Sequence, residues 1–119
     1  MNRNKYGVSP IFMFLVAVAL LALASTAKPS TLPTKTVQVS IHLYKFTPAT
    51  VTVHPGDTVE WKNDDTVDHT ATATGAGTPA FDSGNLKQGQ IFKYVAKTKG
   101  TYDYICTIHP YMKGQVIVR

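Results

Sequence analysis

Near its C-terminus, the chain holds three side chains that bind transition metals, closely spaced along the sequence. Cys106, His109 and Met112 form a C-x-x-H-x-x-M pattern. Copper(I) prefers thiolate and thioether sulfur, and copper(II) accepts imidazole nitrogen, so a site that must hold both oxidation states combines these donors. The pattern therefore predicts a copper site that can change its oxidation state.

A single short loop cannot enclose a metal ion unaided, so we expect a further ligand from an earlier part of the chain. The candidate is His69, which begins a stretch of β-branched and small residues. We predict that His69, Cys106 and His109 form a trigonal set around one copper ion, with Met112 as a weak axial ligand. Pro110 disfavours an α conformation at His109 and stiffens the loop, which favours one geometry in both oxidation states.

The cysteine count supports a metal-binding role for Cys106. It is the only cysteine in the chain, and a lone thiol outside the reducing cytosol is open to oxidation unless it is buried or bound to metal. The alternative is a structural thiol, because free cysteine packs as a small apolar residue. The neighbouring His109 and Met112 favour a ligand.

Residues 1–27 are predicted to be a signal peptide or an uncleaved N-terminal anchor. Arg3 and Lys5 precede an apolar run over residues 11–24, and small residues near positions 22–27 offer cleavage sites. The run is short for a membrane-spanning helix, which needs about 20 residues. We therefore expect an exported protein on the periplasmic or extracellular side, attached to a membrane only if this segment is retained.

The rest of the chain divides into a flexible lead, residues 28–35, and one domain, residues 36–119. The lead holds two prolines among serine and threonine, a composition typical of linkers. Residues 28–119 carry ten basic and seven acidic side chains, and the lysines are spread along the chain. This distribution does not favour nucleic acid binding, and we expect a monomer.

Hydrophobic residues in the mature chain alternate with polar ones, and no segment of ten or more residues keeps a helical period. Seven short strands are predicted near residues 37–43, 50–54, 59–61, 69–74, 90–96, 101–106 and 115–118. Strands of this length, separated by turn residues, favour an all-β sandwich of seven to eight strands. In the sixth strand, Tyr102, Tyr104 and Cys106 share one face, so the thiol should point into the core.

These motifs resemble those of the cupredoxins, the small blue copper proteins of the plastocyanin and amicyanin kind. The matching stretches are residues 46–48, 53–61 with a Pro-Gly-Asp turn, Asn63 and Asp65 ahead of His69, 81–84, and 100–112. The two residues between His109 and Met112 resemble an amicyanin-like short ligand loop. The resemblance implies an eight-stranded Greek-key sandwich, type 1 copper, and electron transfer to redox proteins that dock near His109. Ile108, Pro110 and Tyr111 would form an apolar patch there.

Two positions depart from the family pattern. Thr70 stands where many members carry an asparagine that braces the two ligand segments, and a hydrogen bond from the Thr70 hydroxyl is the substitute we consider. Ile105 stands where plastocyanins carry a surface tyrosine that serves as a second electron exit. We therefore expect electron exchange through His109.

Other functions were weighed against electron transfer. An enzyme would use Cys106 as a nucleophile activated by His109, which leaves Met112 unexplained, so we expect no enzymatic activity. Copper storage or delivery would use the same ligands, so the sequence does not distinguish these functions from electron transfer. Zinc could also occupy such a site, because the donor types alone do not exclude it.

The remaining histidines and a cluster of acidic residues are interpreted as surface groups. His42 and His54 fall on the polar phase of their strands, so we expect neither to bind copper. Asp64, Asp65 and Asp68 lack the regular spacing of a calcium loop, so we expect them to form a solvated turn.

Overall fold

The computed structural model describes residues 22–29, 31–77 and 80–119. Most of the predicted signal segment, residues 1–21, lies outside the described residues. Within the described part, no helix is long and apolar enough to cross a membrane. The chain divides into two units, Met1–Ser30 and Thr31–Arg119, and the strands found among the described residues lie in the second.

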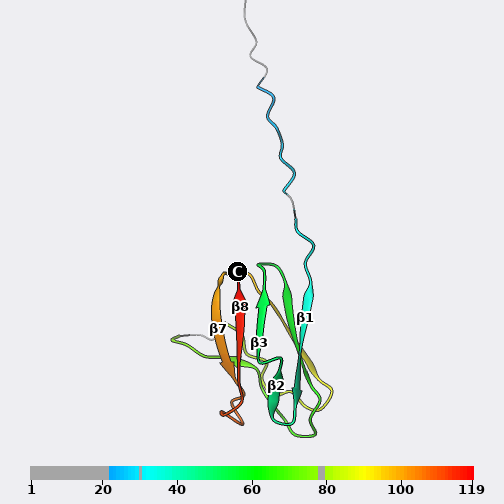
Figure 1. Cartoon of the computed structure of the whole chain (residues 1–119), viewed down its shortest axis with the longest axis vertical. Helices are drawn as coiled ribbons and strands as arrows, with labels where there is room; N and C mark the ends of the chain where they lie inside the picture. The colour runs from blue at the N-terminus through cyan, green and yellow to red at the C-terminus, as the bar shows by residue number, and fades with distance from the viewer. Residues whose placement is uncertain (1–21, 30, 78–79) are drawn as a thin grey trace, which may run out of the picture. The chain divides into compact units, whose positions relative to one another are not determined.

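The folded unit is a sandwich of two four-stranded sheets (Figure 1). Its strands are β1 (Thr36–His42), β2 (Lys45–Thr47), β3 (Thr50–Val53), β4 (Thr58–Asn63), β5 (Thr72–Ala73), β6 (Ile91–Val95), β7 (Gly100–Ile105) and β8 (Lys113–Val118). One sheet has the order β2-β1-β4-β6 and the other β3-β8-β7-β5. The predicted all-β sandwich of seven to eight strands is confirmed.

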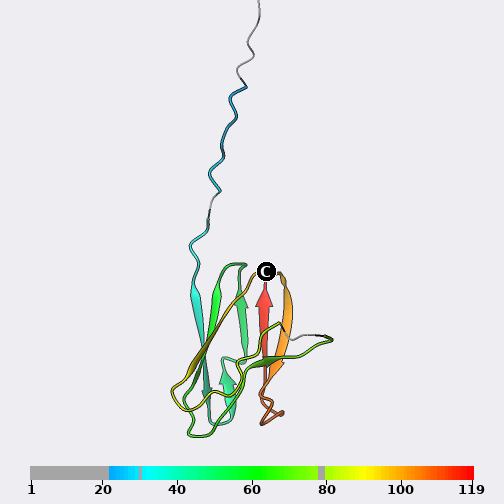
Figure 2. The same ribbon diagram turned by 180° about the vertical axis from the view of Figure 1, so that it is seen from behind.

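The connections between strands place the predicted ligand loop at one end of the sandwich. The chain turns from β7 into β8, its antiparallel neighbour, and both are inner strands of their sheet. The loop between them lies at the end opposite the C-terminus, and the β1–β2 turn lies at that same end (Figures 1 and 2). The ligand loop is therefore anchored on both sides by strands that each have two neighbours.

Alternating apolar residues from both sheets fill the core between them. The largest fully buried side chains include Trp61, Tyr104, Ile41, Val53 and Val116. Fully burying a side chain of this kind stabilises a fold by roughly 1.5–3 kcal/mol. Tyr104 and Cys106 are both buried and Tyr102 is partly buried against the core, so the predicted shared face is confirmed.

The end of the first strand differs from the prediction. The strand predicted near residues 37–43 runs one residue too far, because β1 ends at His42 and Leu43 is 69% exposed. Leu43 and Tyr44 have φ angles of 49° and 57°, and they form a two-residue turn between the paired residues His42 and Lys45. Two-residue turns with positive φ normally use Asn-Gly, so Leu43 and Tyr44 carry no turn signal. Strand β2 was missed for the same reason.

Gly114 follows the ligand loop, but it is not a turn residue. It lies within β8, directly opposite Tyr104 of β7. A Cβ atom at this position would collide with the Tyr104 ring. The glycine therefore makes room for a buried aromatic side chain two residues before Cys106.

We predict that Gly114→Ala lowers the free energy of unfolding by about 1–3 kcal/mol, the usual cost of overpacking a core. Urea denaturation followed by tryptophan fluorescence measures the change. Gln115→Ala, on the same strand, is the control and should stay within about 0.5 kcal/mol of the wild type. Equal midpoints for Gly114→Ala and the wild type would contradict the steric role.

Candidate metal centre

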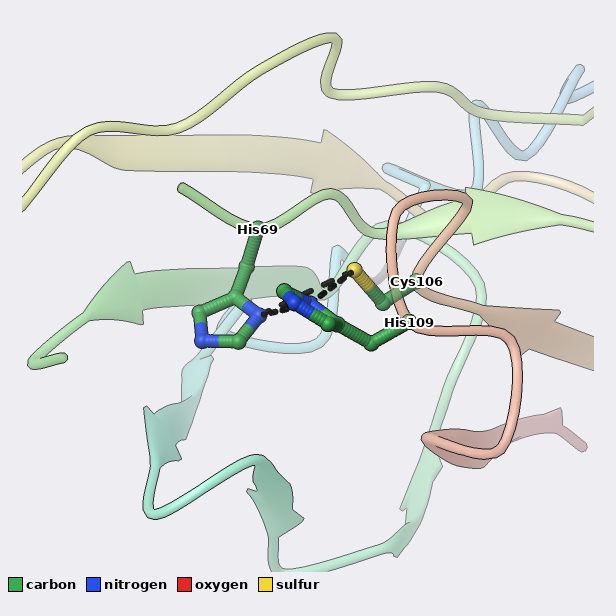
Figure 3. A group of neighbouring side chains, drawn as sticks. All are labelled: His69, Cys106 and His109. Carbon is green, nitrogen blue, oxygen red and sulfur yellow. Dashed lines mark hydrogen bonds between the residues drawn. The ribbon is translucent and has the colours of Figure 1, made fainter. Parts of the chain in front are cut away.

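Three of the predicted ligands converge at the end of the sandwich. The Sγ atom of Cys106 lies 3.7 Å from Nδ1 of His69 and 3.7 Å from Nδ1 of His109, and the two Nδ1 atoms are 3.2 Å apart (Figure 3). Cys106 and His69 are fully buried, and His109 is half-buried. These donors come from the residue after β7, from the loop before β5 and from the β7–β8 loop.

The separations suit a three-coordinate arrangement around one ion. With bonds of ~2.0 Å to nitrogen and ~2.3 Å to sulfur, the lengths known for zinc, trigonal donors lie ~3.5 Å (N to N) and ~3.7 Å (N to S) apart. The two sulfur–nitrogen distances match, and the nitrogen–nitrogen distance is slightly shorter. The described residues therefore fit a metal ion with little movement of the chain.

A buried carboxylate fixes the orientation of the first histidine. Oδ2 of Asp65 lies 2.8 Å from Nε2 of His69, so Nε2–H donates to the carboxylate and the Nδ1 lone pair faces Cys106 and His109. Burial raises the pKa of Asp65, but hydrogen bonds from the backbone N–H groups of Tyr44 and Leu43 and from His69 outweigh it. The pKa of Asp65 is therefore lowered overall, and the carboxylate stays ionised as an acceptor.

The expected solvated acidic turn is wrong for Asp65, which is only 8% exposed. It is right for Asp64, an exposed residue that pairs with Lys62 at 3.2 Å and accepts from the Ser40 hydroxyl at 2.6 Å. The family resemblance did point to Asp65, because the matching stretches include this residue four positions before His69. Residue spacing alone did not distinguish the buried carboxylate from its exposed neighbour.

Asn63 holds the segment that leads to His69. Its side-chain amide donates to the carbonyl oxygens of Val67 and Leu86 at 2.8 and 2.7 Å, and its Oδ1 accepts from the Asp65 N–H at 2.9 Å. His69 and Leu86 exchange two backbone hydrogen bonds. Because the buried polar groups are paired, the first histidine occupies a rigid position.

Thr70 links the two ligand segments through its hydroxyl. Its Oγ1 accepts from the Thr107 N–H at 2.8 Å and lies 3.1 Å from the Thr107 hydroxyl and 3.0 Å from that of Thr72. Its backbone N–H points to Sγ of Cys106 at 3.3 Å. The Thr70 hydroxyl therefore makes the hydrogen bond that we considered as a substitute for the family asparagine. An N–H donor to the sulfur also affects how strongly that sulfur donates to a metal.

The β7–β8 loop is closed by its own backbone. The Cys106 N–H donates to the carbonyl oxygen of Met112 at 3.1 Å, and the Met112 N–H donates to that of His109 at 2.9 Å. Met112 is 2% exposed and begins the return toward β8. The structure places Met112 on this loop within the core, and its part as a ligand remains a prediction.

The other two histidines lie outside the cluster. His42 and His54 have side chains that are 56% and 65% exposed, and they lie beside Asp65 and Asp57 at 3.4 and 3.7 Å. Among the described residues, the group able to hold a metal contains His69, Cys106 and His109. The surface positions predicted for His42 and His54 are consistent with this arrangement.

Exposed apolar side chains lie next to the half-buried His109. Ile108 and Tyr111 are 43% and 68% exposed, and Pro110 is exposed as well. The β1–β2 turn adds to this apolar surface, which the sequence pattern did not predict. Tyr44 in this turn is 42% exposed and lines a shallow groove together with Leu43 and Tyr111. We call these five residues the apolar rim.

The sequence profile of the cupredoxin-like domain matches residues 12–118. The chain belongs to the cupredoxin family. It is 31% identical to amicyanin from Paracoccus versutus, over 87% of this chain and 92% of the relative, and 34% identical to amicyanin-alpha from Methylorubrum extorquens, over 86% and 87%. Within this family, the sulfur and imidazole donors at the end of the sandwich make up a type 1 copper site.

Solved structures give the same family relationship. A reduced Cu(I) form of an amicyanin variant superposes with a TM-score of 0.66 at 30% identity, covering 71% of this chain and 82% of that one. A purple cupredoxin from Nitrosopumilus maritimus gives a TM-score of 0.63 at 30% identity, covering 70% of this chain and 99% of that one. The predicted cupredoxin fold is therefore confirmed by sequence and by structure.

We predict that Thr70→Val lowers the free energy of unfolding by about 1 kcal/mol, because the Thr107 N–H loses its acceptor. It should also change the visible absorption spectrum of the Cu(II) protein, since the two ligand segments lose their link. Thr70→Ser keeps the hydroxyl and should match the wild type in both stability and spectrum. If Val and Ser variants behave alike, the hydroxyl does not brace the site.

Proposed function

We propose that this cupredoxin binds one copper ion and carries single electrons between redox proteins. Nδ1 of His69, Sγ of Cys106 and Nδ1 of His109 would hold the ion, with Met112 as a fourth and weaker ligand. The observation that carries the proposal is the convergence of these three donor atoms within 4.8 Å, on a scaffold held by paired polar groups. Copper supplies a one-electron couple when bound.

The protein's contribution is to limit movement and exclude water. The mixed sulfur and nitrogen donors suit both oxidation states, and the hydrogen bonds of Asp65 and Thr70 hold the two ligand segments in fixed positions. Cys106, Met112 and His69 are buried, which keeps solvent from the donors. Electron transfer of this kind makes and breaks no covalent bond in a substrate, so we propose no enzymatic activity.

The half-buried His109 is the proposed point of electron exchange. It is the most exposed of the four proposed ligands. Ile108 and Pro110 of the apolar rim flank it in sequence, and the rings of Tyr44 and Tyr111 lie 5.0 and 6.2 Å from its ring. Aromatic and apolar residues are typical of the centres of protein interfaces. We propose that redox partners dock on this surface. Ile105 is half-buried, which supports exchange through His109 rather than a second exit at that position.

We propose that the protein works in an exported compartment, the periplasm or the extracellular side. Support comes from the charged and apolar pattern of residues 1–27 and from the single cysteine, buried beside two imidazoles. A lone thiol in an oxidising compartment is protected when it is buried and bound to metal. Whether residues 1–27 are cleaved or retained as an anchor decides membrane attachment.

The direct test is to add Cu(II) to the purified protein. We predict an intense visible charge-transfer band from copper bound to the Cys106 thiolate, which a reductant bleaches and an oxidant restores. Cys106→Ser should lack the band, whereas His42→Ala and His54→Ala should keep it unchanged. A tightly bound, colourless Cu(I) that resists oxidation would instead support copper storage or delivery.

The role of Met112 has a separate test. We predict that Met112→Leu retains copper and the visible band but shifts the reduction potential, because a weak axial ligand tunes the relative stability of Cu(II) and Cu(I). Voltammetry of the two proteins measures the potential, and metal analysis measures occupancy. Complete loss of copper would mean that Met112 is not a weak axial ligand.

A further inference from the structure

Tyr44, in the β1–β2 turn, contacts both histidines of the cluster. Its ring lies 5.0 Å from the His109 ring and 5.5 Å from the His69 ring, measured between centroids, with interplanar angles of 87° and 86°. Both are edge-to-face arrangements, in which the positive edge of one ring meets the negative face of the other. One aromatic side chain from a distant turn thus contacts two proposed ligands that come from two other segments.

The turn that carries Tyr44 is held by the same carboxylate as His69. Asp65 accepts the backbone N–H of Leu43 at 2.8 Å and that of Tyr44 at 3.0 Å, and its Oδ2 also bonds to Nε2 of His69. These bonds offset the strain of two positive φ angles at residues other than glycine. The position of Tyr44 is therefore tied to the position of His69 through one residue.

The two histidines are not equally fixed by hydrogen bonds. The His69 ring has Asp65 as a partner outside the donor cluster. In the described part of the chain, the His109 ring is paired only with Cys106 Sγ and His69 Nδ1, which are themselves metal donors. His109 also lies on a loop and is half-buried. The nearest rings to His109 are those of His69, itself a donor, at 4.9 Å and of Tyr44 at 5.0 Å, whereas Tyr111 is 6.2 Å away. Outside the donor cluster, Tyr44 is therefore the closest ring to His109 among the described residues.

We propose that Tyr44 is a positioning residue for the metal site, which holds the imidazole of His109 in its ligating orientation against that of His69. The inference rests on the proposed copper function. Tyr44 limits the movement of His109 between the two oxidation states and so speeds electron exchange. The ring makes the contact, so the hydroxyl group is not required.

The test compares Tyr44→Ala and Tyr44→Phe in the copper-loaded protein. Electron self-exchange is measured from NMR line broadening in mixtures of the reduced and oxidised forms. We expect Tyr44→Ala to slow it roughly fivefold or more, a size typical for the loss of edge-to-face contacts, and to alter the electron paramagnetic resonance spectrum of Cu(II). Tyr44→Phe keeps the ring and should match the wild type in both measurements.

Leu43→Ala is the matched control, because Leu43 lies in the same turn and belongs to the same apolar rim. It removes exposed apolar surface without removing a ring from the histidines. If Leu43→Ala slows self-exchange as much as Tyr44→Ala and neither spectrum changes, Tyr44 contributes docking surface only and the inference is overturned. A wild-type rate and spectrum for Tyr44→Ala would overturn it too. Failure of the wild-type protein to form the visible copper band would instead refute the proposed function.

Discussion

The arrangement of the metal centre depends on the hydrogen bonds of one buried carboxylate. Asp65 accepts from Nε2 of His69 and from two backbone N–H groups of the β1–β2 turn. The first bond sets which imidazole nitrogen of His69 faces the other donors. The other two bonds hold a turn in which Leu43 and Tyr44 have positive φ angles, which residues other than glycine seldom adopt. A side chain that accepts three hydrogen bonds in a buried site joins parts of the chain that are distant in sequence.

The two ligand segments are rigid for different reasons. The His69 segment is fixed by polar groups, chiefly the Asn63 amide and the backbone pairing with Leu86. The β7–β8 loop is fixed by its shortness, by the backbone pairing of Cys106 with Met112, and by the inner strands on either side. Thr70 connects the two segments. A site built this way needs little reorganisation when the charge on its metal changes, which is the property that an electron carrier requires.

Much of the site could be predicted because it depends on local features. Residue types and spacing pointed to His69, Cys106 and His109, and the structure brings their donor atoms together. The period of two in the strands predicted the sandwich, because alternate side chains face alternate sides of a sheet. The prediction failed where contacts distant in sequence decide the conformation. Leu43 fitted a buried strand position by its pattern, yet the Asp65 carboxylate stabilises a turn there. Gly114 resembled a turn residue, yet the ring of Tyr104 across the sheet requires it.

The amino-acid sequence was enough to predict the donor types, the short ligand loop, the alternation of the strands and the resemblance to cupredoxins. These are properties of residue chemistry and of spacing along the chain. The burial of Asp65 next to an exposed Asp64, and the packing of Tyr44 against both imidazoles, are evident only in the folded protein. Burial and ring contacts arise when separate strands meet at one end of the sandwich, and no local pattern records which side chains will face each other there.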